Sequence, residues 1–197
     1  NRYPRDRWYP LLERFTEAAL ARGHAWVEDH NAPGAVGVGP TPFNMLDGRR
    51  QTPADHYLDP ALDRPNLRLL TGMTCNRVRM RDGRVTAVEA LGADGQAVVL
   101  EADHVIVCLG TYASPALLMR SGVGRPEDLV PHGIRVEHEL AGVGRGMQDH
   151  PKISYRFDLG LEPPTWPSPW IQVLLTATAE VAGESRLFQV MPYAGTT

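Results

Sequence analysis

The residues with the clearest chemical pattern form one run, Gly110 to Gly124, with the sequence GTYASPALLMRSGVG. It follows an apolar stretch, Val105 to Leu109, and this order predicts a buried strand, a glycine turn and a helix that opens at Ser114 and Pro115. Ser114 would cap that helix by accepting a backbone N–H, and Pro115 suits the first helical position because it has no N–H to satisfy. Such a junction brings backbone very close to a ligand at the positive end of the helix.

The other residues with chemical potential give weaker patterns. Asp149 and His150 are an acid and a base, but adjacent residues of an extended segment point in opposite directions and cannot easily act on one atom. Ser121 closes a helix instead of opening one, so Ser121–Gly124 is not a nucleophile elbow. The remaining histidines lack any regular ligand spacing: His24, His30, His56, His104, His132 and His138. We therefore predict no metal site and name no catalytic residue in this chain.

The elements that must position these residues follow from periodicity and turn residues. A helix is predicted over residues 10–22 and another from a capping box, Thr52–Asp55, to about Leu62; residues 29–48 are rich in glycine and proline and predict a loop. Asp82-Gly83 predicts a tight hairpin turn inside a three-stranded antiparallel meander. Strands are expected at 67–71, 75–80, 84–91, 97–100, 105–109, 134–137, 153–159 and 187–190. Residues 172–181 are expected to form a helix or a strand. Residues 162–170 are expected to form a loop, in which Trp166 and Trp170 either wall a substrate cavity or pack the loop.

Composition excludes several classes of protein. The chain has 197 residues, of which 43% are hydrophobic and 22% charged, and these fractions are typical of globular domains. A net charge of −3 with scattered arginines predicts no nucleic-acid partner. No apolar run approaches the roughly 20 residues of a membrane span, and the first residues do not form a signal peptide. Cys75 and Cys108 are predicted in strands as small buried thiols, which suits a reducing, cytoplasmic location.

The run from Gly110 resembles a sequence pattern of the glucose–methanol–choline (GMC) oxidoreductases, flavoproteins that oxidise alcohols. The filled positions are Gly110, Thr111, Ser114, Pro115, Leu117, Leu118, Ser121, Gly122, Val123 and Gly124. Four further segments are similar to family motifs: Asp29–Asn31, Asp47–Thr52 with Tyr57-Leu58, Arg64–Leu67 with Leu70–Gly72, and Val143–Pro151. Thr52 stands where many members have serine, and Gly146 replaces the family asparagine. The resemblance therefore covers nearly the whole chain.

This resemblance implies an FAD cofactor and an alcohol substrate. Cys75 occupies the position, usually valine, whose backbone contacts the adenine of FAD in relatives, and Gly110 and Thr111 at the strand end are the other expected cofactor contacts. The implied fold is mixed α/β (α+β), with parallel strands and the meander in a partial FAD-binding domain and part of a substrate-binding domain. We place the substrate side at 1–65, the partial FAD-binding domain at 66–150 and a partial substrate-binding domain at 151–197.

Two features of the family pattern are missing from the chain. Gly34, Gly37 and Gly39 do not give a GxGxxG fingerprint, nor do Gly142, Gly144 and Gly146. The second missing feature is the catalytic histidine, which the resemblance places near the C-terminus of relatives and which we expect to lie outside this segment. We therefore expect the central segment of a FAD-dependent alcohol dehydrogenase or oxidase, partnered by the rest of its chain and inactive alone. The alternatives are a non-catalytic scaffold that keeps the family core without flavin, and a nicotinamide-dependent dehydrogenase, which the inserted meander disfavours.

Overall fold

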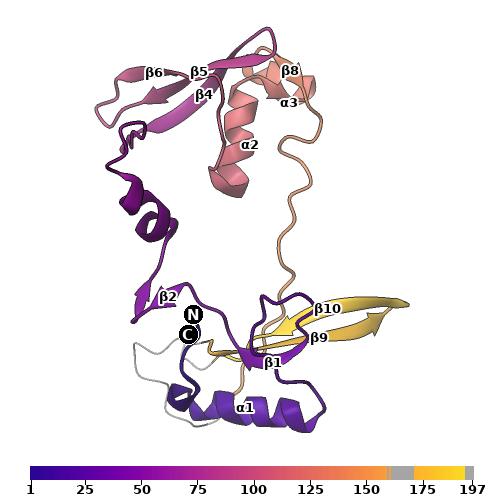
Figure 1. Cartoon of the computed structure of the whole chain (residues 1–197). Coiled ribbons are helices and arrows are strands. Elements are labelled where there is room, and N and C mark those ends of the chain that lie inside the picture. The colour runs from indigo at the N-terminus through magenta and orange to yellow at the C-terminus, as the bar shows by residue number, and fades with distance from the viewer. Residues whose placement is uncertain (159, 161–170, 194–197) are drawn as a thin grey trace. The chain divides into compact units, whose positions relative to one another are not determined.

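The computed structural model describes residues 1–158, 160 and 171–193, and it divides into two compact units (Figure 1). The first unit comprises Asn1–Leu67 and Arg156–Thr197, and the second comprises Arg68–Tyr155. The assignment of these units to the flavin side and the substrate side of an enzyme stays a prediction. The loop predicted at 162–170, with Trp166 and Trp170, lies outside the described residues.

The first unit packs a helix, α1 (Pro10–Ala21), against a three-stranded sheet. The sheet has the order β1-β9-β10, from β1 (Gly37–Pro40), β9 (Val173–Val181) and β10 (Glu184–Val190), and both pairings are antiparallel. Pro10 takes the first turn of α1, as predicted, because that turn needs no N–H. The core between helix and sheet includes Leu12 and Val38, both with no exposed surface.

The first unit differs in part from the loop predicted at residues 29–48, and it shows whether residues 172–181 form a helix or a strand. Most of that predicted loop is irregular, but it also contains β1 and β2 (Met45–Leu46), which pairs with β3 (Arg49–Arg50). Gly39 in β1 is there for close approach, because a Cβ atom on it would lie 1.8 Å from the Val27 carbonyl oxygen. The segment at 172–181 is a strand, β9.

The helix predicted from the Thr52–Asp55 capping box is a pair of short turns. They are η2, a π-helical turn (Ala54–Leu58), and η3, a 3-10 turn (Asp59–Ala61). The capping box is half formed: the Thr52 N–H donates to Asp55 Oδ2 at 2.7 Å, but the Thr52 hydroxyl donates to the same carboxylate instead of accepting from the helix. These two bonds, the hydroxyl first, hold the pKa of Asp55 below its ordinary value.

The second unit contains the predicted meander and the helix that follows it. Strands β4 (Thr74–Arg81), β5 (Arg84–Leu91) and β6 (Ala97–Glu101) pair in sequence order, all antiparallel. Asp82 and Gly83 both have positive φ, which gives the tight turn that matches the twist of the strands. The helix α2 (Gly110–Arg120) packs on β4 (Figure 1). The remaining elements are η1 (Arg5–Arg7) in the first unit and β7 (Val123–Gly124), α3 (Pro126–Leu129), η4 (Val130–His132) and β8 (His138–Glu139) in the second.

The strand predicted at 134–137 does not form there; a two-residue strand, β8, begins directly after it and pairs in parallel with β7. Three further predicted strands do not form in the described part of the chain. Residues 67–71, 105–109 and 153–158 have no pairing partner there, and Ile106 is 88% exposed. Their composition suits strands, but a strand needs a neighbour to take its N–H and C=O groups. Cys108 consequently lies in an exposed, unpaired segment and is not the buried strand residue that we predicted. None of the helices in the described ranges is both long enough and apolar enough to span a bilayer.

Candidate functional site

The helix α2 begins at Gly110, four residues before the predicted start at Ser114. Gly110 adopts a φ of +79°, a conformation that glycine enters at little cost. The Ser114 hydroxyl accepts the N–H of Leu109 at 3.2 Å, so it binds the residue before the helix and does not cap the helix itself. Pro115 is the sixth residue of α2 and not its first, so the helix lacks the regular bond to the carbonyl of Thr111 at this point.

The predicted cofactor residues Gly110 and Thr111 are exposed at the N-terminal end of α2. Nothing lies within 4 Å of a Cβ atom built on Gly110, so the chain's own packing does not fill the space beside it. The first N–H groups of an α-helix have no partner within the helix, and the helix dipole favours negative charge at this end. The junction can therefore accept an anionic group against bare backbone.

The third predicted cofactor residue, Cys75, lies near the other end of α2. It is half-buried in β4, its thiol is free, and it pairs with Ala90 of β5. The register then shifts by one residue, because Arg77 pairs with Glu89 and Asn76 is left as an extra residue in β4. Such a bulge bends a strand and changes the direction of its backbone groups.

Two residues at the end of α2 bind the backbone of β4 on both sides of this bulge. The Arg120 guanidinium donates to the carbonyl of Asn76 at 2.8 Å and to that of Cys75 at 3.5 Å. The Ser121 hydroxyl accepts the N–H of Val78 at 2.8 Å and donates to the carbonyl of Leu117 at 2.6 Å. Nothing in the sequence indicates that the Arg120 guanidinium reaches the backbone of a distant strand, so its role here follows only from the structure.

The predicted cofactor residues therefore lie at opposite ends of α2, with Gly110 and Thr111 at its start and Cys75 of β4 beside its end. Eleven helical residues, at roughly 1.5 Å of rise each, separate the two ends by about 16 Å. A single small group cannot touch both ends, whereas different parts of an extended dinucleotide can. The run Gly122–Gly124 that follows serves packing: Gly122 ends α2 with a φ of +85°, as predicted, and a Cβ atom there would lie 2.5 Å from the carbonyl oxygen of Arg135.

The charged side chains on the meander form a separate surface cluster. Arg77 and Arg79 of β4 both donate to the carboxylate of Glu89 on β5, with Arg77 Nε 2.7 Å from Glu89 Oε2. These two guanidinium groups, Arg77 first, lower the pKa of Glu89 to about 2. Glu89 therefore stays ionised near neutral pH, but with so low a pKa its carboxylate is too weak a base for efficient general-base catalysis there.

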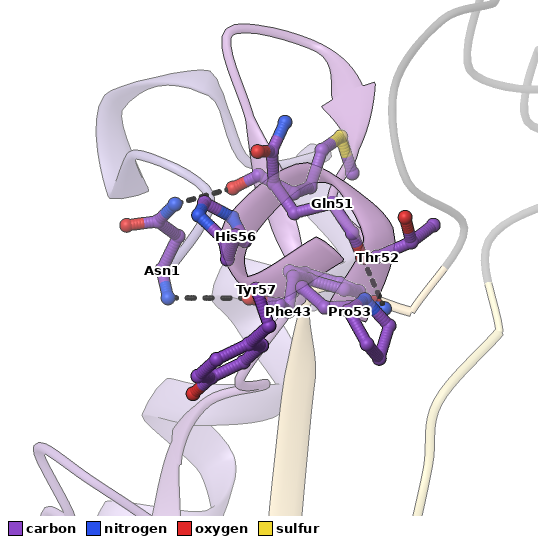
Figure 2. Close-up of a pocket in the computed structure, with 9 residues that line it drawn as sticks. Asn1, Phe43, Gln51, Thr52, Pro53, His56 and Tyr57 are labelled. Carbon is purple, nitrogen blue, oxygen red and sulfur yellow. Dashed lines mark hydrogen bonds between the residues drawn. The ribbon is translucent and has the colours of Figure 1, made fainter. Parts of the chain in front are cut away.

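The first unit has a pocket of about 450 Å³, shown in Figure 2. It is lined by Asn1, Phe43, Asn44, Met45, Gln51, Thr52, Pro53, His56 and Tyr57. None of these residues is Lys or Arg, and none is a predicted cofactor residue, so the pocket gives no reason to place a pyrophosphate there. For this reason we rank the pocket below the ends of α2 as a candidate site.

The acid–base and metal candidates form no site in the described ranges. Asp149 Oδ1 accepts the backbone N–H of His150 at 2.7 Å, and both residues are exposed. That contact joins a side chain to the adjacent backbone and does not aim the imidazole at a carboxylate. No group of three or more His, Cys, Asp or Glu residues in this part of the chain could hold a metal ion.

Comparison with known proteins identifies the family of this chain. The family model described as GMC oxidoreductase matches residues 5–152. A GMC-type oxidoreductase of Rhodococcus erythropolis, described as uncharacterised, is 43% identical over 148 residues, and the oxygen-dependent choline dehydrogenase of Rhizobium johnstonii is 36% identical over 148 residues. Each alignment covers 75% of this chain, but only 30% and 27% of the respective relatives. The chain belongs to the GMC oxidoreductase family, and it spans less than a third of the length of these relatives.

Solved structures agree with this family. A crystal structure of pyridoxine 4-oxidase from Mesorbium loti superposes with a TM-score of 0.66 at 36% identity, over 70% of this chain and 27% of that one. An FAD-dependent oxidoreductase from Chaetomium thermophilum shares the fold, with a TM-score of 0.63 at 24% identity, over 70% of this chain and 24% of that one. These likenesses confirm the predicted mixed α/β fold of a partial GMC oxidoreductase.

Proposed function

We propose that this chain is the central segment of a FAD-dependent enzyme that oxidises the CH–OH group of a small alcohol. Membership of the GMC family supports an oxidoreductase, and the structural likeness to the FAD-dependent oxidoreductase from Chaetomium thermophilum supports FAD. The observation that carries the proposal is the open junction at Gly110, where exposed backbone N–H groups at a helix start can receive an anionic ligand.

The residues of this segment would hold the cofactor and would not perform the chemistry. Gly110 and Thr111 would contact a phosphate or ribose group with backbone, and the backbone of Cys75 would contact the adenine. Bound FAD supplies the acceptor for the hydride that leaves the alcohol carbon. We assign no proton transfer to this segment, because neither the sequence nor the geometry singles out a catalytic acid or base in it.

The unpaired segment Val105–Leu109 supports a place inside a larger sheet. It runs directly into the Gly110 junction, it pairs with no strand in the described residues, and Ile106 is 88% exposed. Burying one such side chain is worth about 1.5–3 kcal/mol, so an exposed apolar segment of this kind gains stability from a covering layer. We propose that other strands of the full-length chain supply that layer.

The test is expression of the full-length gene, followed by anaerobic titration with a panel of alcohols that includes pyridoxine and choline. Bleaching of the flavin absorbance near neutral pH by at least one alcohol is the expected result. A full-length protein that binds FAD but is bleached by none would contradict the alcohol substrate. A full-length protein that binds no FAD would instead favour the non-catalytic scaffold.

The segment alone provides the complementary test. We expect the purified 197-residue chain to be colourless and to oxidise no alcohol, because the predicted contacts at its two candidate positions are only part of a dinucleotide site. Stoichiometric flavin absorbance in the purified chain would overturn this expectation.

A further inference from the structure

The C-terminal end of α2 fixes the backbone at Cys75 by two side chains that come from adjacent positions. Arg120 binds the carbonyl of the bulge residue Asn76 at 2.8 Å, and Ser121 binds the N–H of Val78 at 2.8 Å. The two bonds hold an acceptor and a donor of β4 two residues apart. A bulge leaves the extra residue of a ladder without its regular partner, so an external partner decides its direction.

The bond at Ser121 belongs to a buried and fully used hydroxyl. Ser121 is 5% exposed, and its oxygen accepts from Val78 while its proton goes to the carbonyl of Leu117. Buried polar groups with both roles satisfied rigidify the elements that they join. Arg120 adds a charged donor, which makes a stronger bond to a carbonyl than a neutral group does. The helix and the bulged strand therefore form one rigid piece at this point.

We propose that Arg120 and Ser121 are positioning residues for the cofactor: they aim the Cys75 backbone at the adenine half of FAD. This inference rests on the proposed function. One rigid helix then sets both candidate contacts, with Gly110 at its start and the bulge of β4 at its end. A substitution at the end of α2 should therefore affect the adenine half of the cofactor selectively and leave the flavin half unaffected.

The experiment measures binding of the two halves separately in the full-length enzyme after its flavin has been removed. The probes are ADP, which carries the adenine and pyrophosphate, and FMN, which carries the flavin, each titrated by calorimetry. Arg120→Gln should weaken ADP and FAD binding about tenfold, as expected for the loss of one charged hydrogen bond, and leave FMN binding within about twofold. Arg120→Lys keeps a charged donor and should recover part of the ADP affinity.

The matched control is Arg145→Gln, in the same unit. Arg145 donates to both carboxylate oxygens of Asp128, at 2.6 and 2.7 Å, and touches no residue of β4 through these bonds. It should leave both affinities unchanged. Equal losses of ADP and FMN binding with Arg120→Gln, or no loss of either, would overturn the positioning role.

A third variant, Ser121→Ala, tests the other side of the bulge and should also weaken ADP more than FMN. If Arg120→Gln fails to unfold cooperatively, Arg120→Lys is compared with the wild type instead. The positioning role is then judged from the same ratio of ADP affinity to FMN affinity. A wild-type protein that binds no FAD removes the proposed function and this role together. A wild type that binds FAD, with variants that show no selective loss, removes only the role of Arg120 and Ser121.

Discussion

Gly122→Ala is the substitution whose cost the structure defines best. Gly122 adopts a φ of +85°, and for other residues this left-handed conformation costs about 1–2 kcal/mol. A Cβ atom would also lie 2.5 Å from the Arg135 carbonyl oxygen and 2.8 Å from Glu137 Cγ. Overpacking of this kind typically costs about 1–3 kcal/mol, so the expected total is roughly 2–5 kcal/mol.

The matched control for this prediction is Gly133→Ala. Gly133 has a similar φ of +70°, but nothing lies within 4 Å of a Cβ atom built on it. Gly133→Ala should therefore lower the free energy of unfolding by about 1–2 kcal/mol through backbone conformation alone, without the crowding. The difference between the two variants isolates the crowding term, about 1–3 kcal/mol, which corresponds to roughly 5- to 150-fold in an equilibrium constant.

Hydrogen exchange of the full-length protein measures this difference. The N–H groups of Glu137 and His138 donate to the carbonyl of Gly122, at 2.9 and 3.2 Å. Their exchange should accelerate in Gly122→Ala beyond its rate in Gly133→Ala by the factor above, because exchange follows the local opening free energy. Equal exchange rates in the two variants would refute the argument that close packing, and not backbone conformation alone, requires glycine at this position.

Three further predictions concern other parts of the chain. Because Glu89 has a folded-state pKa of about 2 against an ordinary value of 4.5, its bonds with Arg77 and Arg79 contribute stability above pH 4.5 that is lost as pH falls towards 2; Glu89→Gln should flatten that part of the melting-temperature profile, and an unchanged profile would contradict the assignment. Ile106→Asp should lower the melting temperature of the full-length protein but not the stability of the isolated chain, and equal effects would argue against a covering layer. Leu12→Ala should cost about 2–5 kcal/mol in urea unfolding followed by tryptophan fluorescence, since Leu12 has no exposed surface in the α1 core; a cost below 1 kcal/mol would be inconsistent with that core.

Local patterns predicted much of the fold. The Asp82-Gly83 turn and the meander around it follow from short-range backbone preferences, and so does the end of α2 at Gly122. The start of α2 did not follow, because Ser114 and Pro115 fit a helix start by type, whereas Gly110 could begin the helix earlier by adopting a positive φ. The residue types therefore limited the positions at which α2 could begin and end, and the backbone conformation of the glycines determined which positions were used.

Pairing between distant segments was harder to predict. The glycines around residue 37 predict a loop, yet β1 forms there and is buried, because only glycine allows the backbone of Val27 so close to Gly39. Conversely, Val105–Leu109 has the composition of a strand but pairs with no other strand in the described residues. Whether an extended segment becomes a strand depends on a neighbour that its own sequence does not specify.

The sequence by itself determined the family, because a run such as Gly110–Gly124 constrains many positions at once and each residue type in it is visible directly. It also determined the local turns, whose preferences lie within a few residues. Only the tertiary structure placed Cys75 and Gly110 at opposite ends of α2 and brought Arg120 and Ser121 onto the backbone of β4. Those contacts join residues more than forty positions apart, and such contacts exist only after the chain has packed the helix on the strand.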